Sequence, residues 1–331
     1  MKIDIFAHII PQKYVDAVDK RTKQGHFLKE WSEGRTPTLS DLDERFRIMD
    51  KYDGYVQVLT VSQFHRIVCD PKAVEMAQIA NDMLAELILK HPDRFAGAVA
   101  CVPWNDVDAS CREIDRAINE LGFKGIEIWT PIDGKPIDLP VFSPVYEKMA
   151  QYNLPIWIHP QRAAQSPDYR SEEESKYGIY SIFGWPYDTT AAMTRLVFSH
   201  VLQDYPNLKF ITHHCGALVP YFAQRIVSHI NYNEMRAKQK HTQGLTKHPI
   251  EYFRMFYNDT ALSGNTPALM CAYAFFGAEH MLFGTDMPFD SLNGDSSVND
   301  TIVAIEQMDI PDSDKKKIFE DNARQIMRLP V

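Results

Sequence analysis

Short apolar runs alternate along the chain with longer segments in which apolar residues recur every three or four positions. The runs predict strands centred near residues 4, 57, 98, 127, 157, 210, 256 and 283. Apolar strands separated by amphipathic helices are typical of a parallel sheet that helices cover. Eight such units in a chain of 331 residues predict one (β/α)8 TIM barrel domain spanning residues 1–331.

The helical period predicts helices over residues 40–50, 71–91, 107–121, 141–152, 188–203 and 219–232, and a further helix at the C-terminus. Ser40 is expected to cap the first of them. Residues 12–40 show no clean period, which predicts an N-terminal excursion that covers the site or contacts a partner. A doubly wound sheet is the alternative, but no glycine-rich turn follows the first strand to hold a dinucleotide.

Composition narrows the class of partner. The net charge is −9 and no basic run resembles a nucleic-acid arm, so we expect a small-molecule substrate and no nucleic acid. The five cysteines are scattered and lack CxxC spacing, which argues for a reducing compartment and against a disulfide framework or a thiolate zinc site. No apolar run reaches membrane-spanning length, and the expectation is a soluble cytoplasmic protein.

Four polar residues follow the predicted strands 1, 5, 6 and 8: His8, His159, His214 and Asp286. A barrel brings the carboxyl ends of its strands together around one mouth. A lone histidine at a strand end is more often a hydrogen-bonded core residue, and Asp286 could be a turn residue before Pro288. Four such residues at one mouth instead predict a catalytic site for zinc or another first-row divalent ion, with a coordination position left open.

Two histidines stand side by side in the sequence Ile-Thr-His-His-Cys-Gly at 211–216. Adjacent residues at a strand end point to opposite faces. We therefore expect His214 to face the mouth and His213 to be its structural neighbour.

Several segments carry a family resemblance that covers nearly the whole chain. They are RFRIMD at 45–50, HPDRF at 91–95, ELGFKGI at 120–126, WIHP at 157–160, YPNLK at 205–209 and LFGTDMPF at 282–289, together with the first strand and its His8. In order and spacing the chain resembles the amidohydrolase superfamily. The matching branch includes 2-amino-3-carboxymuconate-6-semialdehyde decarboxylase and the γ-resorcylate and 5-carboxyvanillate decarboxylases.

The resemblance implies a metal, zinc or alternatively manganese, held by His8, His159 and Asp286, and no organic cofactor. It places His214 beside the open position as base or fourth ligand, so that His214 and Asp286 are the catalytic pair. It also implies a homodimer or a dimer of dimers, in which Arg225 holds a substrate carboxylate and reaches into the neighbouring subunit's site.

Two further substrate contacts are expected from position alone. Arg162 follows the strand that carries His159, so it is a candidate carboxylate clamp. Trp129 ends the fourth strand and would suit a flat, apolar substrate.

One position departs from the family pattern, because the first strand carries Phe6-Ala7-His8 where His-x-His or Glu-x-His is usual. Phenylalanine cannot bind a metal, so three functions stay open. The first is non-oxidative decarboxylation of a small aromatic or unsaturated hydroxycarboxylic acid by a carbon–carbon lyase. The second is metal-dependent hydrolysis or hydration of a carboxylated substrate, although strand 4 offers no lysine for a carbamylated bridge. The third is a metal-free or inactive barrel that binds a ligand.

Overall fold

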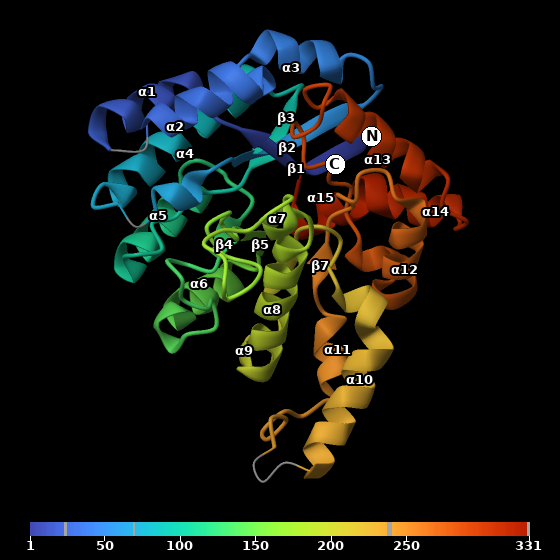
Figure 1. The fold of residues 1–331 in the computed structure, drawn as a ribbon. Coiled ribbons are helices and arrows are strands. Elements are labelled where there is room, and N and C mark those ends of the chain that lie inside the picture. The colour runs from blue at the N-terminus through green and yellow to red at the C-terminus, as the bar shows by residue number, and fades with distance from the viewer. Residues whose placement is uncertain (23–24, 69, 237–239, 330–331) are drawn as a thin grey trace.

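The computed structural model describes residues 1–22, 25–68, 70–236 and 240–329. Two parallel sheets form its centre (Figure 1). The first has the order β1-β2-β3, comprising β1 (Lys2–Ile9), β2 (Tyr55–Val61) and β3 (Phe95–Ala98). The second has the order β4-β5-β6-β7, comprising β4 (Ile126–Thr130), β5 (Pro155–Pro160), β6 (Lys209–Thr212) and β7 (Tyr257–Asn258). Since strands that are consecutive in sequence pair in parallel, the topology is that of the predicted (β/α)8 barrel.

Single bridges join the edges of the two sheets. Ala100 pairs with Ile126 between β3 and β4, and Asn258 pairs with Met281 beyond β7. Ala7 pairs with Met287, which brings the last strand segment back to β1.

The eighth strand, expected near residue 283, is therefore present only as isolated bridges and not as a regular strand. Two residues explain the irregular backbone. Asp286 has a φ of +59°, outside the extended region. Gly284 lies so close to β7 that a Cβ there would stand 2.9 Å from the Cβ of Asp259.

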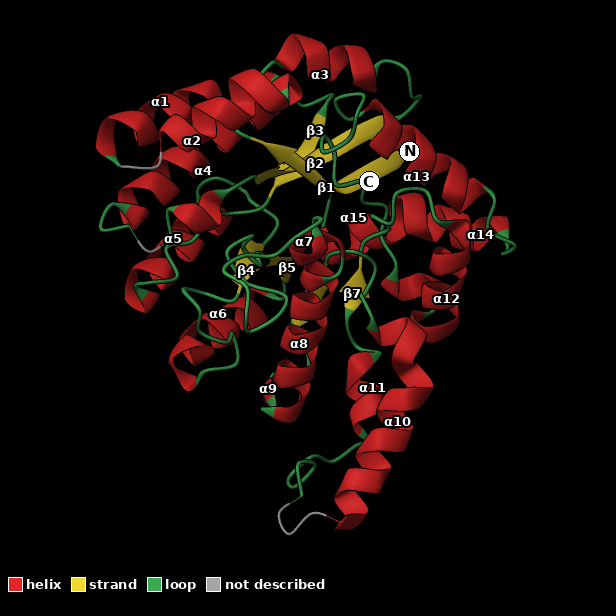
Figure 2. Cartoon of the chain, viewed as in Figure 1, coloured by secondary structure: helices red, strands yellow, loops and turns green. Residues whose placement is uncertain are grey.

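Helices surround the sheets (Figure 2). They are α1 (Gln12–Arg21), α2 (Gly25–Lys29), α3 (Leu42–Met49), α4 (Ala73–Lys90), α5 (Val107–Asn119), α6 (Ser143–Tyr152), α7 (Ile179–Ile182), α8 (Gly184–Phe198), α9 (Val201–Asp204), α10 (Val219–Arg236), α11 (Pro249–Phe253), α12 (Thr266–Phe276), α13 (Asp295–Glu306), α14 (Asp312–Lys316) and α15 (Asn322–Met327). Helix α4 shows why they form: Met76, Ala80 and Leu84 recur every four residues and are all buried. None of the described helices is long and apolar enough to cross a bilayer.

The excursion over residues 12–40 is largely helical, because short helices such as α1 bury Tyr14 and Val18 over too few turns to show a clear period. Two details of the sequence prediction are wrong. Helix α3 is capped by Asp41, whose carboxylate accepts from Glu44 N at 3.0 Å, and not by Ser40. The helix expected at 188–203 is two helices, because His200 adopts a left-handed φ of +70° between them.

The inside of the barrel is filled with apolar side chains. Ile5, Val58, Trp157 and Ile211 pack there with Phe6, and all are buried. The indole of Trp157 donates to the carbonyl of Ile5 at 3.0 Å, which spans the interior. Since no channel runs through such a core, a binding site has to lie at the mouth.

The described cysteines Cys101, Cys111, Cys215 and Cys271 are free thiols. Cys69 lies outside the described residues.

Candidate active site

Asp286 lies at the centre of the mouth. Its Oδ1 stands 3.2 Å from Nε2 of His8 and 3.2 Å from Nε2 of His213. Its Oδ2 stands 3.8 Å from Nε2 of His214. The backbone N–H of Asp286 donates to the carbonyl of Phe6 at 3.1 Å, which ties the carboxylate to β1.

Three imidazoles meet beside this carboxylate. The ring nitrogens that His8, His159 and His213 offer lie within 4.8 Å of one another, and His213, His214 and Asp286 form a second group of the same size. The structure thus brings together His8, His159, His214 and Asp286, which the sequence analysis predicts at the ends of four different strands.

A hydrogen bond at Nδ1 orients each of the three rings. Nδ1 of His8 lies 2.9 Å from Oγ1 of Thr60, and Nδ1 of His159 lies 2.6 Å from the carbonyl of Pro160. Nδ1 of His213 pairs with the carboxylate of Asp259. Metal-binding histidines are commonly held this way through the nitrogen that does not bind the ion.

Within the described chain, the buried Nε2 atoms of His8 and His213 make no hydrogen bond of good geometry, although each lies 3.2 Å from Oδ1 of Asp286. Buried polar atoms without a partner are uncommon. Nitrogen ligands beside one carboxylate suit zinc or manganese, so the residues present fit a divalent ion.

The expectation that His213 turns away from the mouth is wrong. Strand β6 ends at Thr212, and His214 and Cys215 then adopt left-handed φ values of +56° and +54°. Because the backbone is no longer extended, side chains no longer alternate between faces. Both imidazoles reach Asp286, and their ring centroids lie 4.0 Å apart.

Asp259 makes this turn possible, and the sequence interpretation missed it. Its buried carboxylate accepts from the backbone N–H of His214 at 3.2 Å, of Cys215 at 2.8 Å and of Ala261 at 3.1 Å. The available signal was a carboxylate at the end of strand 7.

Phe6 supports His213. Their rings stack with centroids 4.0 Å apart and an interplanar angle of 18°, and the Phe6 side chain is fully buried. The residue that departs from the family pattern therefore packs directly against an imidazole of the histidine cluster that could hold a metal ion.

The charges in the cluster are strongly coupled. Burial lowers the pKa of His213, but the carboxylates of Asp259 and Asp286 outweigh it and raise the pKa to about 10. Burial and the charge of His213 lower the pKa of His214 to about 4. Burial opposes ionisation of Asp286, yet His213 and His8 hold its pKa well below the usual range. Without a metal, the cluster thus carries an imidazolium at His213 between two carboxylates and a neutral imidazole at His214.

Of the expected substrate contacts, Trp129 lies in the cluster. Its ring stacks on His159 with centroids 3.9 Å apart, and His65 packs on it at 4.6 Å. The guanidinium of Arg162 lies 3.6 Å from the carboxylate of Asp188, and the backbone carbonyl of Arg162 accepts a hydrogen bond from the indole of Trp185. Arg225 is exposed on α10, where it lines a shallow groove with Phe222 and two other residues of that helix.

A polar cavity of about 150 Å³ opens beside the cluster. His214 and Asp286 line it together with Thr285, Phe289, Ser263 and residues at the start of α13. Its size suits a small substrate group placed directly against both proposed catalytic side chains.

Glu127 is a second residue that sequence reasoning did not assign to the site. It lies on β4 two residues before Trp129 and is 3% exposed, and neither carboxylate oxygen has a well-formed hydrogen bond within the described chain. Burial raises its pKa to about 8, although His213 and Trp129 lower it. The side chain is therefore largely a neutral carboxylic acid at neutral pH.

We expect Glu127→Gln to reduce the pH dependence of stability. The pKa is about 8 when folded against 4.5 for the free group, so its contribution is full below pH 4.5 and is lost as the pH rises through 8. That contribution is on the order of 5 kcal/mol. Urea unfolding at pH 5 and pH 8 measures it, with Glu147→Gln at an exposed site on α6 as control. Equal pH dependence in wild type and Glu127→Gln would show that Glu127 is not buried as a neutral acid.

Comparison with known proteins shows which family the chain belongs to. The amidohydrolase family model matches residues 3–329. A γ-resorcylate decarboxylase from Polaromonas sp. is 29% identical over 314 residues, which cover 91% of each chain. A 2-amino-3-carboxymuconate-6-semialdehyde decarboxylase from Dictyostelium discoideum is 27% identical over 87% of this chain and 82% of its own. The solved structure of a dihydroxybenzoic acid decarboxylase from Polaromonas sp., with bound manganese and the inhibitor 2-nitroresorcinol, superposes with a TM-score of 0.81 at 26% identity over 99% of this chain and 96% of that one. The chain belongs to the amidohydrolase family.

Proposed function

We propose that the protein is a divalent-metal-dependent decarboxylase that releases CO2 from a small aromatic or unsaturated hydroxycarboxylic acid. The observation that carries this proposal is the convergence of His8, His159 and His213 on the carboxylate of Asp286. Relatives with decarboxylase names over most of the chain support the reaction class.

His8, His159 and Asp286 hold the ion in this proposal, and His213 adds an imidazole beside Phe6, which cannot bind metal. When bound, the ion supplies a Lewis acid that polarises an oxygen of the substrate. Zinc and manganese both suit these ligands. We also propose a cytoplasmic location, because scattered free cysteines suit a reducing compartment.

Asp286 and His214 handle the proton. Decarboxylation leaves a carbon that has to gain a proton when CO2 departs, so a side chain must hold one near that carbon. The two side chains stand 3.8 Å apart and share the wall of the polar cavity. The neutral imidazole of His214 is able to accept a proton from substrate and return it to carbon.

The function is tested by incubating purified protein, loaded with manganese or zinc, with hydroxybenzoates and muconate-like acids. We expect CO2 release, and in D2O one deuterium at the carbon that carried the carboxylate. Metal analysis of the same batch distinguishes the alternatives. Cleavage of esters or amides without CO2 would favour the hydrolase, and absence of bound and bindable metal would favour the metal-free barrel.

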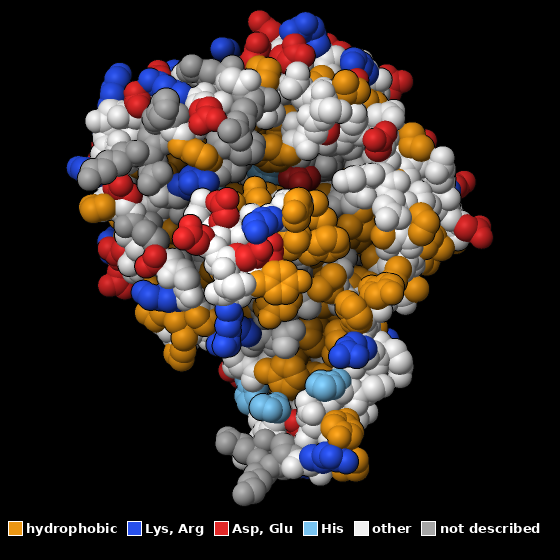
Figure 3. All heavy atoms as spheres, in the orientation of Figure 1, with side chains coloured by type: hydrophobic (Ala, Val, Ile, Leu, Met, Phe, Trp, Pro, Cys, Tyr) orange, Lys and Arg blue, Asp and Glu red, His pale blue; other side chains and the backbone are white. Residues whose placement is uncertain are grey.

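A second copy of this chain is the protein partner we propose. The long helix α10 extends away from the barrel beside α11 (Figure 1), and Val219 is its buried residue. Large apolar side chains are exposed on it and near α8, namely Tyr221, Phe222, Tyr232, Met235, Phe183 and Tyr187. Figure 3 shows hydrophobic side chains gathered between α8 and α10.

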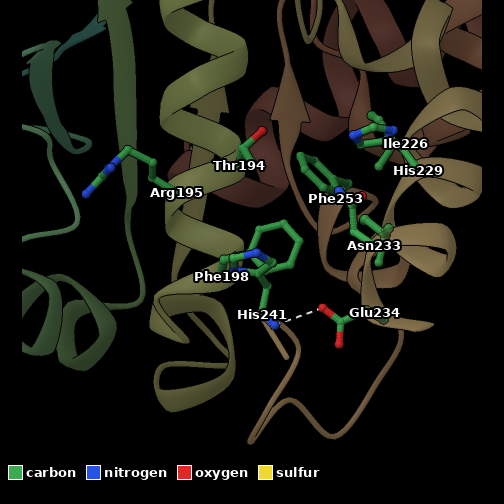
Figure 4. Close-up of a pocket in the computed structure, with 10 residues that line it drawn as sticks. Thr194, Arg195, Phe198, Ile226, His229, Asn233, Glu234, His241 and Phe253 are labelled. Carbon is green, nitrogen blue, oxygen red and sulfur yellow. Dashed lines mark hydrogen bonds between the residues drawn. The ribbon is translucent and has the colours of Figure 1, made fainter. Parts of the chain in front are cut away.

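A groove of about 410 Å³ separates the two helices (Figure 4). Phe198 from α8, Ile226 from α10 and Phe253 from α11 line it, and none of the proposed ligands does. It is larger than the polar cavity beside Asp286, but neither of the proposed catalytic residues lines it, so we assign it to association and not to chemistry. An exposed apolar surface of this kind commonly marks a protein interface.

Arg225→Ala is expected to raise KM for a carboxylate substrate about 10- to 100-fold and to change kcat less, because a hydrogen-bonded charge contributes about 1.5–3 kcal/mol. Arg236→Ala, at the end of the same helix, is the matched control. Steady-state kinetics measures KM and kcat, and light scattering measures whether the protein is a dimer. An unchanged KM would show that Arg225 is a surface residue without contact to substrate. A protein that stays monomeric at all concentrations would exclude a site to which Arg225 of a second subunit contributes.

A further inference from the structure

A fully buried arginine lies directly behind the metal-binding cluster. Arg45 belongs to α3, and its side chain has no exposed surface. Its guanidinium donates to the carbonyl of His8, to the carbonyl of Thr38 at 3.2 Å and to Oε1 of Gln57 at 2.7 Å. One hydrogen bond therefore reaches the backbone of a proposed ligand.

Hydrogen bonds continue from Gln57 to a buried carboxylate. Nε2 of Gln57 donates to the hydroxyl of Tyr55 at 3.0 Å, and that hydroxyl donates to Oδ2 of Asp4 at 2.6 Å. Both Tyr55 and Asp4 are buried. The positive charge of Arg45 and the negative charge of Asp4 are thus connected through two neutral side chains across β1 and β2.

The other end of the network holds the residue before Asp286. Oδ2 of Asp4 accepts from the hydroxyl of Thr285 at 2.6 Å, and Oδ1 accepts from the backbone N–H of Thr285 at 3.1 Å. Oδ1 also accepts from the backbone N–H of Phe6 at 3.0 Å. Backbone hydrogen bonds to β1, such as the one from Asp286 to Phe6, set the register of the segment that carries Asp286, and the bonds to Asp4 add side-chain contacts that hold the same register.

Buried charges without a direct partner are costly. Among the ion pairs of the described residues, none involves Arg45 or Asp4. A more stable barrel could place apolar side chains here, which points to a role beyond stability.

We propose that Arg45, Gln57, Tyr55 and Asp4 form a positioning network that sets the distance between His8 and Asp286. The network contacts His8 through its carbonyl and Asp286 through Thr285, and it touches neither the ion nor the substrate. This inference rests on the proposed function, since it concerns the same metal-binding cluster.

Tyr55→Phe tests the network, because it removes the central hydroxyl and leaves the ring. We expect manganese affinity and kcat each to fall about 10- to 100-fold, the usual effect of removing a partner behind a metal ligand. The control is Tyr146→Phe, since Tyr146 is equally buried and its hydroxyl donates to the carbonyl of Ile137 near α6. A merely structural role predicts similar losses of thermal stability in both variants and no selective loss of metal affinity. Equal metal affinities in the two variants would overturn the proposal.

Thr285 offers a rescue test. Thr285→Val keeps the shape and the backbone bond to Asp4 but loses the hydrogen bond from the hydroxyl to Oδ2 of Asp4, and we expect it to resemble Tyr55→Phe. Thr285→Ser keeps the hydroxyl and is expected to restore metal affinity to within about threefold of wild type, because the hydroxyl is what carries the bond. Equal affinities for the Val and Ser variants would remove Thr285 from the network.

A spectroscopic measurement separates this inference from the proposed function. In protein labelled with 15N-histidine, Tyr55→Phe should shift the imidazole resonances of His8 with or without metal, and Tyr146→Phe should not. If wild type binds no metal but these shifts appear, the network stands and the decarboxylase proposal fails. If metal binds and no resonance of His8 moves, the network proposal fails.

Discussion

Asp286→Asn is expected to abolish turnover while the protein remains folded. Asparagine matches the shape of aspartate but carries no charge, so His8 and His213 lose the negatively charged carboxylate that lies 3.2 Å from each of them. The pKa of Asp286 is held well below its usual range, so the wild-type group is ionised throughout the working pH range. Loss of a positioned acid–base group lowers rates by about 10²- to 10⁴-fold, and loss of a ligand adds to that. Steady-state CO2 release and metal content measure the effect.

Asp108→Asn is the matched control, because Asp108 is an exposed carboxylate on α5 that does not line the polar cavity. We expect near wild-type turnover from it. Circular dichroism of both variants should match the wild type. A wild-type rate for Asp286→Asn would remove this residue from the mechanism.

His213→Ala is expected to prevent metal binding and to destabilise the metal-free protein. The substitution removes a ring that stands between Asp259 and Asp286 and stacks on Phe6. Removing one partner of a buried ion pair lowers the free energy of unfolding by about 3–5 kcal/mol. Because the folded-state pKa of His213 is about 10, against 6.5 for free histidine, this stability is present below pH 6.5 and is lost as the pH rises through 10. Urea unfolding at pH 6 and pH 10 should show a larger loss at pH 6.

His214→Ala distinguishes the two neighbouring histidines. We expect it to keep most of the bound manganese but to lose turnover, since His214 lies at the edge of the cluster, 3.8 Å from Asp286. His91→Ala, at the C-terminal end of α4 and outside both groups of possible metal ligands, controls for loss of an imidazole. If His214→Ala loses the metal and His213→Ala keeps it, His214 and not His213 would be the additional metal ligand.

The sequence by itself determined the architecture and most of the cluster. Apolar runs with intervening helical period are a direct consequence of burying strands under helices, so the strand positions and the barrel could be read from the chain. A barrel gathers the carboxyl ends of its strands, which is why His8, His159 and Asp286 could be grouped although they are far apart in sequence. Helix caps and the short helices at 12–40 escaped prediction, because local patterns over a few residues do not show which face is buried.

Only the tertiary structure decided which side chains share the mouth beyond the ends of the strands. Strand alternation predicts direction only while the backbone is extended, and after Thr212 it turns left-handed around Asp259, a residue 46 positions away from His213 along the chain. That contact directs His213 onto Phe6 and into the cluster. Glu127 and Arg45 likewise look like ordinary charged residues in the sequence, because burial and hydrogen-bond partners depend on packing between distant segments.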